Sequence, residues 1–284
     1  MADVNLKVAP PPTPAQRRGE IAAILARHGW EALLYQLSLV DFLPSGLRSK
    51  LSKYTVTARN VTEEGEEVEL KLPLPQVFRA ILEDLGPTFV KLGQVMSTRA
   101  DILPPAYIEE LSKLQEKVTP VDWAAMEPVL LEEWAGKIRD RNLGEPDATS
   151  ASQIFLEFET TPLAAGSIGQ VYEAKIADPI TGQPRHVIIK LQRPGVDGVV
   201  EADLALLRDF ARTLSKRFEW ARFYNLGEIV EEFAGVIRGE MDFTREGQNT
   251  EIIGHSLTKH YAKQVSTPRV FWDFSSRRML TLEF

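Results

Sequence analysis

One segment sets the architecture: Pro162-Leu163-Ala164-Ala165-Gly166-Ser167-Ile168-Gly169-Gln170-Val171-Tyr172, read together with Val187-Ile188-Ile189-Lys190. Strand patterns flank the run of small residues, over 154–161, 171–176 and 186–192. The turn at 178–182 contains the Pro and Gly that bend a hairpin. The order is strand, small-residue loop, strand, hairpin, and a strand with a lysine near its end. It predicts a clamp for nucleotide phosphates, in which a flexible lid covers a fixed ammonium group.

The same residues allow a plainer interpretation. A hairpin rich in Gly and Ala beside an ordinary surface lysine would have this sequence, and a small-residue loop alone is weak evidence for a nucleotide site. The loop is followed by Lys190 and later by an acidic helix that contains Glu240, Asp242 and Glu246. This combination favours the nucleotide site over the plain hairpin.

Three motifs, at 91–94, 164–171 and 240–242, resemble those of the UbiB (aarF-domain, ABC-one) family of atypical kinases. Residues 164–171 are similar to the alanine-rich loop that replaces the glycine-rich loop of ordinary kinases. Lys91-Leu92-Gly93-Gln94 matches the Lys-x-Gly-Gln signature, and Glu240-Met241-Asp242 matches the Glu-x-Asp signature. The resemblance covers most of 75–284, with one departure at Gly166, where many members have a third alanine; glycine makes the loop more permissive.

The resemblance implies an α+β fold. We expect a protein-kinase-like N-lobe, made of a five-stranded antiparallel sheet plus helix C, preceded by an all-helical N-terminal extension. The expected divisions are a disordered tail at 1–14, a helical extension at 15–150 with the Lys-x-Gly-Gln helix, and the N-lobe at 151–284. Periodicity predicts helices at 14–39, 75–85, 87–98, 106–115, 121–135, 199–218 and 226–256, and the last two strands at 268–273 and 277–284.

The resemblance also implies a set of ATP-binding residues. Lys190 is expected to bind the α- and β-phosphates and to pair with Glu246 on helix C. The alternative partners of Glu246 are its neighbours Arg245 and Arg238. The remaining expected nucleotide contacts are the loop residues, the valine after them and the first hinge residue: Ala164, Ala165, Gly166, Ser167, Ile168, Gly169, Val171 and Glu283.

A regulatory gate is the second implied site. By resemblance, Lys91 and Gln94 lie over the nucleotide groove and face Glu240 and Asp242. Without the resemblance, Lys91 and Gln94 would be placed on the solvent face of an amphipathic helix. On one straight helix Glu240 and Asp242 would point about 200° apart. Therefore either the helix bends near Gly239 or the two acids have different partners.

Composition excludes several classes of protein. The net charge of −7 argues against a general nucleic-acid binder, and the absence of cysteine excludes disulfides and thiolate metal sites. No secretory signal and no apolar run of about 18 residues is found, so we expect a cytoplasmic or peripherally membrane-associated protein. Residues 1–60 are basic, and this segment could lie on an anionic membrane surface or fold as a helical hairpin with solvated charges.

The end of the sequence bears on activity. It stops near the expected hinge, before the catalytic-loop Asp and the Mg²⁺-binding Asp that the resemblance implies. The chain is therefore expected to be an inactive N-terminal fragment of an ATP- and Mg²⁺-dependent atypical kinase or ATPase that supports isoprenoid lipid or quinone (ubiquinone) biosynthesis. The alternatives are a non-catalytic module that binds nucleotide, a protein partner, a membrane or a second copy of itself, and a scaffold without a ligand.

Overall fold

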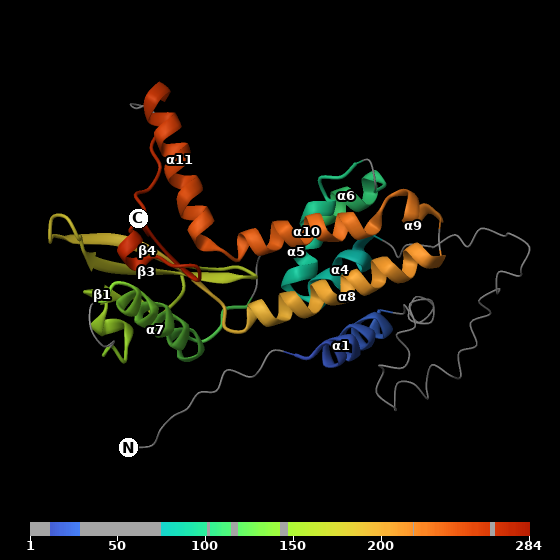
Figure 1. Cartoon of the computed structure of the whole chain (residues 1–284), viewed down its shortest axis with the longest axis horizontal. Coiled ribbons are helices and arrows are strands. Elements are labelled where there is room, and N and C mark those ends of the chain that lie inside the picture. Colours follow the sequence, from blue (N-terminus) through green and yellow to red (C-terminus); the bar gives the residue numbers. More distant parts are fainter. Residues whose placement is uncertain are drawn as a thin grey trace, which may run out of the picture. The chain divides into compact units, whose positions relative to one another are not determined.

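The computed structural model describes residues 12–28, 75–100, 103–114, 119–142, 147–217, 219–261 and 265–284. These residues form two compact units, which Figure 1 shows in sequence colours. The sheet unit contains the described parts of 116–197 and 235–284, and the helical unit contains those of 11–115 and 198–234. The units are interleaved along the chain, so their limits do not coincide with the expected division at residue 150. The predictions for residues 1–11 and 29–74 lie outside the described residues.

The sheet has five antiparallel strands, as predicted. The central strand β3 (Gly169–Ala177) pairs with β1 (Glu157–Phe158), β2 (Ala164–Ala165) and β4 (Pro184–Gln192). The last strand, β5 (Met279–Glu283), pairs with the other edge of β4. The α+β class with a kinase-like N-lobe sheet is thereby confirmed.

Two of the predicted strands are not strands over their expected length. Residues 154–161 contain only the two-residue β1, preceded by the 3₁₀ turn η2 (Ala151–Gln153). Residues 268–273 contribute an isolated bridge at Val270 and then the 3₁₀ turn η3 (Trp272–Phe274). The small-residue loop supplies the fifth strand, because Ala164–Ala165 fold back onto β3. Short apolar runs predict burial better than they predict strand pairing.

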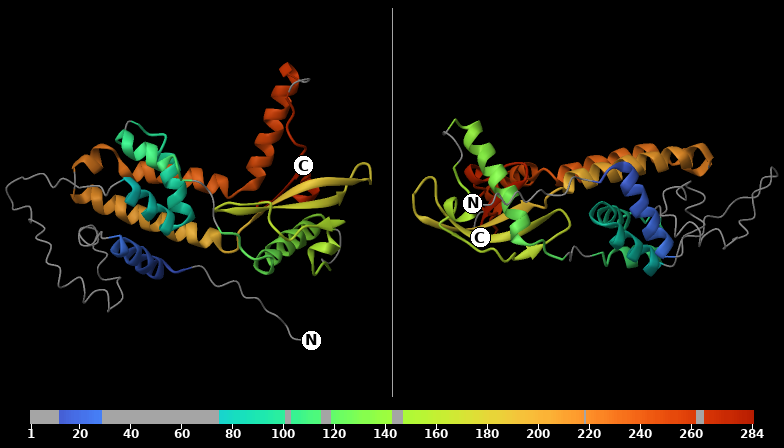
Figure 2. Two further views of the ribbon diagram at one scale, coloured as in Figure 1. Left: turned by 180° about the vertical axis from the view of Figure 1, so that it is seen from behind. Right: turned by 90° about the horizontal axis from the view of Figure 1, so that it is seen from below.

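The two faces of the sheet differ in burial. Alternate residues of β3 and β4 face a core that includes Met126 and Leu130 of α7 (Trp123–Asp140). Figures 1 and 2 show α7 along this face and α11 (Phe243–Tyr261) on the other side of the sheet. The face opposite α7 is half-buried and presents Val171, Glu173 and Lys175 from β3 and His186, Ile188 and Lys190 from β4. We refer to it as the open face.

The helix predicted over 226–256 is interrupted. It forms α10 (Leu226–Glu240) and α11, with Met241 and Asp242 between them. The bend near Gly239 that the positions of Glu240 and Asp242 suggested is therefore present. The apolar stripe along 226–237 predicts a buried Val236, which is instead 45% exposed.

The helical unit contains α1 (Pro14–Arg27), α4 (Pro75–Leu85), α5 (Pro87–Met96), α6 (Pro105–Leu111), most of α8 (Val196–Arg217), α9 (Glu219–Phe223) and the start of α10. Its core is apolar, with Ile21, Leu82, Phe89, Leu111 and Leu206 among the buried residues. Gly86 separates α4 from α5 at φ +92° and ψ −165°, a conformation that favours glycine.

No helix in the described part of the chain has both the length and the apolar composition to cross a bilayer.

Candidate nucleotide site

The Lys190 ammonium and the Glu246 carboxylate meet on the open face. Their Nζ and Oε2 atoms lie 2.6 Å apart, and the side chains are 32% and 44% exposed. Glu246, the residue expected to pair with Lys190, is thus in contact with it. An exposed ion pair contributes little to stability. Because the ammonium remains accessible to solvent, a ligand phosphate can approach it.

Strand register puts Lys190 on the open face. It lies opposite Val171 on β3 and Leu280 on β5, and two residues from Ile188, which therefore faces the same way. Its Nζ also lies 4.7 Å from the centroid of the Phe243 ring. Ile188 and Phe243 are not among the site residues predicted from the sequence. The two-residue spacing from Lys190 could have identified Ile188, whereas Phe243 approaches only through the tertiary fold.

Helix α11 carries Glu246 and packs closely against the end of the sheet. A Cβ on Gly247 would lie 2.8 Å from the Trp272 ring, so glycine permits this approach. The Trp272 indole N–H donates to Glu251 Oε1 at 2.7 Å, one turn further along α11. These two contacts fix the side of α11 adjacent to Glu246.

The small-residue loop is a tight hairpin. Ala164 and Ala165 pair with Val171 and Gln170, and the Gly166 N–H donates to the Gly169 carbonyl at 2.9 Å. The N–H groups of Ser167 and Ile168 have no hydrogen-bond partner among the described residues. Both residues are buried, at 5% and 9% exposed. The turn must therefore move before these donors can reach a ligand.

Gln170, which the sequence analysis did not assign, holds the loop to the segment before α7. Its amide oxygen accepts from the Val121 N–H, and its amide nitrogen donates to the Val121 carbonyl at 3.1 Å. The same nitrogen contacts the Tyr172 hydroxyl at 2.5 Å. Burial raises the pKa of that Tyr172 hydroxyl, which the Gln170 contact partly opposes. Gln170 is thus a structural member of the loop, and its side chain is fully buried.

The expected hinge residue Glu283 ends β5. Its N–H donates to the Arg269 carbonyl at 2.9 Å, and its carboxylate lies 3.4 Å from Arg185 Nη1. Its role beside an adenine ring stays a prediction.

The four expected gate residues lie in different units. Lys91 and Gln94 belong to α5 of the helical unit, where Gln94 donates to the Leu114 carbonyl at 3.2 Å. In the sheet unit Glu240 ends α10, and Asp242 precedes α11 and accepts from the Thr244 N–H at 3.1 Å. Asp242 therefore caps α11. The expected closure of a groove by these four residues stays a prediction.

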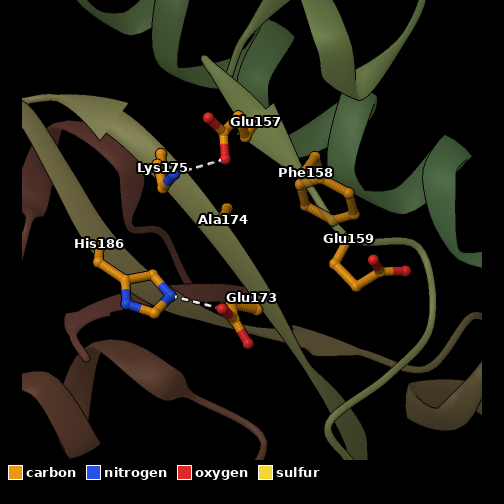
Figure 3. A pocket seen from close by; sticks show the side chains of 7 residues that line it. All are labelled: Glu157, Phe158, Glu159, Glu173, Ala174, Lys175 and His186. Carbon is orange, nitrogen blue, oxygen red and sulfur yellow. Dashed lines mark hydrogen bonds and ion pairs between the residues drawn. The ribbon is translucent and has the colours of Figure 1, made fainter.

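A surface hollow of about 290 Å³ lies farther from Lys190 on the open face, over β1, β3 and β4. Figure 3 shows two pairs among its side chains, Lys175 with Glu157 and His186 with Glu173, each at 2.7 Å. None of the expected site residues lines this hollow. The described residues contain no group of three or more His, Asp or Glu side chains that could hold a metal ion.

Comparison with known proteins finds a family match and similar sequences. Residues 113–284 match the family described as ABC1 atypical kinase-like domain. The Synechocystis protein slr0889, described as uncharacterized, is 33% identical over 276 residues, which cover 96% of this chain and 57% of that protein. A Xanthomonas campestris protein with the name "Probable protein kinase UbiB" is 37% identical over 205 residues, covering 72% of this chain and 34% of that protein.

A solved structure also matches. The complex of Rv3197 with erythromycin, from Mycobacterium tuberculosis, is 26% identical with a TM-score of 0.42, covering 72% of this chain and 46% of that chain. The chain therefore spans only part of these relatives: 57% of the Synechocystis protein and 34% of the Xanthomonas protein.

Proposed function

Because this chain belongs to the ABC1 atypical kinase-like family, which includes the UbiB proteins, we propose that its sheet unit binds ATP on the open face. The single observation that supports this most strongly is the meeting of Lys190 and Glu246, which are 56 residues apart in sequence. A pairing of strand lysine and helix glutamate is the one that a kinase N-lobe uses to hold its phosphate-binding lysine. A chance surface pair would not also lie beside a small-residue loop in a sheet of this topology.

The residues present fit a nucleotide. The Lys190 ammonium would neutralise charge on the phosphates, and Glu246 would hold that ammonium in place. Ser167 and Ile168 are successive residues in the turn whose N–H groups lack partners among the described residues, an arrangement that suits phosphate oxygens once the turn opens. Val171 and Ile188 provide apolar surface beside Lys190 for the base. Mg²⁺ would reach the site with the nucleotide phosphates, as it does in kinases.

The biological setting follows from the family resemblance. ATP binding would serve isoprenoid lipid or quinone biosynthesis at or near a membrane surface. Complementation of a bacterial strain that lacks its own UbiB protein, with quinone content as the measurement, tests this part separately from nucleotide binding.

The experiment for nucleotide binding compares two lysines on the same sheet face. Lys190→Met removes the proposed phosphate contact, whereas Lys175→Met removes a lysine that is ion-paired with Glu157 at 2.7 Å on the open face. Thermal unfolding and calorimetric titration with Mg-ATP are measured for both variants and the wild type. At 100 times its dissociation constant, ATP should stabilise the wild type by about 2.7 kcal/mol.

We expect Lys175→Met to retain the ATP-induced stabilisation and Lys190→Met to lose most of it. Absence of any effect of Mg-ATP on the wild type would overturn the proposal. Equal responses of the two variants would overturn the assignment of Lys190.

A further inference from the structure

Gln192 lies two residues beyond Lys190 and ends β4. Its side chain is fully buried, and its amide nitrogen donates to the Met241 carbonyl at 3.0 Å. Met241, itself 2% exposed, is the first residue of the break between α10 and α11. The amide oxygen of Gln192 is buried without a hydrogen-bond partner among the described residues. The hydrogen bond to the Met241 carbonyl is therefore the interaction that the buried Gln192 amide makes.

The second residue of the break, Asp242, and the first residue of α11, Phe243, are also fixed. Asp242 caps α11 through the Thr244 N–H, and the Phe243 N–H donates to the Arg277 carbonyl at 2.9 Å. Phe243 is 1% exposed, and its ring lies below the Lys190 ammonium. Three consecutive residues are thus held in place at the start of α11.

Glu246 is three residues beyond Phe243, less than one helical turn away. A shift of the break would therefore displace Glu246 with it. We propose that Gln192 is a positioning residue, which holds the start of α11 so that Glu246 pairs with Lys190. The consequence for ATP rests on the function proposed above, whereas the anchoring of α11 does not.

The chemistry requires a donor at position 192. A carbonyl near the end of a helix lacks an intrahelical partner, and burial removes water as a substitute. An aliphatic side chain would leave the Met241 carbonyl unpaired. A glutamate carboxylate would present a second acceptor to it, but a protonated glutamic acid could donate. Burial raises the pKa of a glutamate, to as high as about 8–9 in documented cases, so the proton can be added at mild pH.

The test uses the full chain with Gln192→Leu and Gln192→Glu, and with Gln183→Leu as a control at an exposed position on the β3–β4 turn. Without nucleotide, hydrogen exchange of the amides in 243–250 should accelerate in Gln192→Leu and not in the control. With Mg-ATP, Gln192→Leu should weaken binding about tenfold, the factor expected when a buried carbonyl is left unpaired.

Gln192→Glu supplies the distinguishing measurement. Its ATP affinity, relative to that of the wild type at each pH, should be weak at pH 8.5 and recover as the pH falls to 6. Gln192→Leu should show no such recovery. In a Glu246→Gln background, Gln192→Leu should weaken ATP binding no further, because the residue that it positions has lost its charge.

Unchanged exchange over 243–250 in Gln192→Leu would overturn the anchoring. Additive effects of Gln192→Leu and Glu246→Gln on ATP affinity, or the same pH profile for Gln192→Glu and Gln192→Leu, would overturn positioning through Glu246. A wild type that does not bind ATP would reject the proposed function, while the exchange measurement without nucleotide would still decide whether Gln192 anchors α11.

Discussion

At the residue scale, Gly169 shows how closely the small-residue loop approaches its surroundings. A Cβ at this position would lie 2.8 Å from the Leu191 carbonyl oxygen and 3.2 Å from the Phe243 ring. The first of these neighbours is main chain and cannot rotate away. The glycine is therefore required by packing between β3, β4 and α11, in addition to any role it has toward a ligand. The same residue connects the loop to the ring that lies below Lys190.

We expect Gly169→Ala to lower the unfolding free energy of the sheet unit by about 1–3 kcal/mol, the usual cost of overpacking. Gly136→Ala is the matched control, since a Cβ there meets nothing within 4 Å and lies inside α7. That control should be neutral or stabilising by about 0.5–1 kcal/mol. Urea unfolding of the two variants checks the difference, and equal stabilities would contradict the packing argument.

At the element scale, the β3–β4 hairpin is held by one buried carboxylate. Asp178 Oδ1 accepts from the N–H groups of Ile180 and Thr181 at 2.8 and 3.3 Å, and Oδ2 lies 2.8 Å from Arg269 Nη1. These contacts hold the pKa of Asp178 below its usual value. The hydrogen bond from the Ile180 N–H has the largest effect, and those from the Thr181 N–H and Arg269 add to it. Asp178 therefore fixes both the turn and the segment that pairs with the outer edge of β5.

A lowered pKa makes this contribution dependent on pH. The folded state binds the Asp178 proton more weakly than the unfolded state, so the stabilisation is present above the unfolded pKa of about 3.9 and is lost as the pH falls through the folded value. Asp178→Asn should therefore be less stable than the wild type at pH 6, with the difference shrinking below about pH 4. Thermal unfolding from pH 3 to 7 measures this difference.

Asp140→Asn removes a carboxylate from the exposed end of α7 and serves as the control. It should change the midpoint little at either pH. A difference between wild type and Asp178→Asn that stays constant from pH 3 to 7 would contradict the assignment.

At the scale of the whole molecule, each unit has its own core and its own polar anchor. In the helical unit Arg17 pairs with Asp203 at 2.6 Å and donates to the Leu85 carbonyl at 2.5 Å. Arg17 is 8% exposed and Asp203 is fully buried. Burial raises the pKa of the Asp203 carboxyl, and the Arg17 guanidinium opposes that change. The pair connects α1 and α8 to the residue just before the Gly86 break, and so to the start of α5.

Arg17→Met should destabilise the helical unit by about 3–5 kcal/mol, because it leaves the Asp203 charge buried and unpaired. Arg17→Met combined with Asp203→Leu should recover much of the loss. Hydrogen exchange should show the change in α1, α5 and α8, with little change in β3 and β4. Equal acceleration in both units would mean that they unfold as one.

The sequence by itself determined the family, the α+β class, the break at Gly86-Pro87 and the candidate pair Lys190 and Glu246. The loop and the helix break depend on local chemistry, namely small side chains and a proline at a helix start, whereas the pair of Lys190 and Glu246 follows from the family resemblance. The sequence overestimated the strands at 154–161 and 268–273, since an apolar run does not reveal whether its backbone finds a pairing partner. It also missed Gln170 and Gln192, whose buried amides bind main-chain groups 49 residues away. Only the tertiary structure decided these contacts, because a side chain carries no local signal for a partner that reaches it through folding.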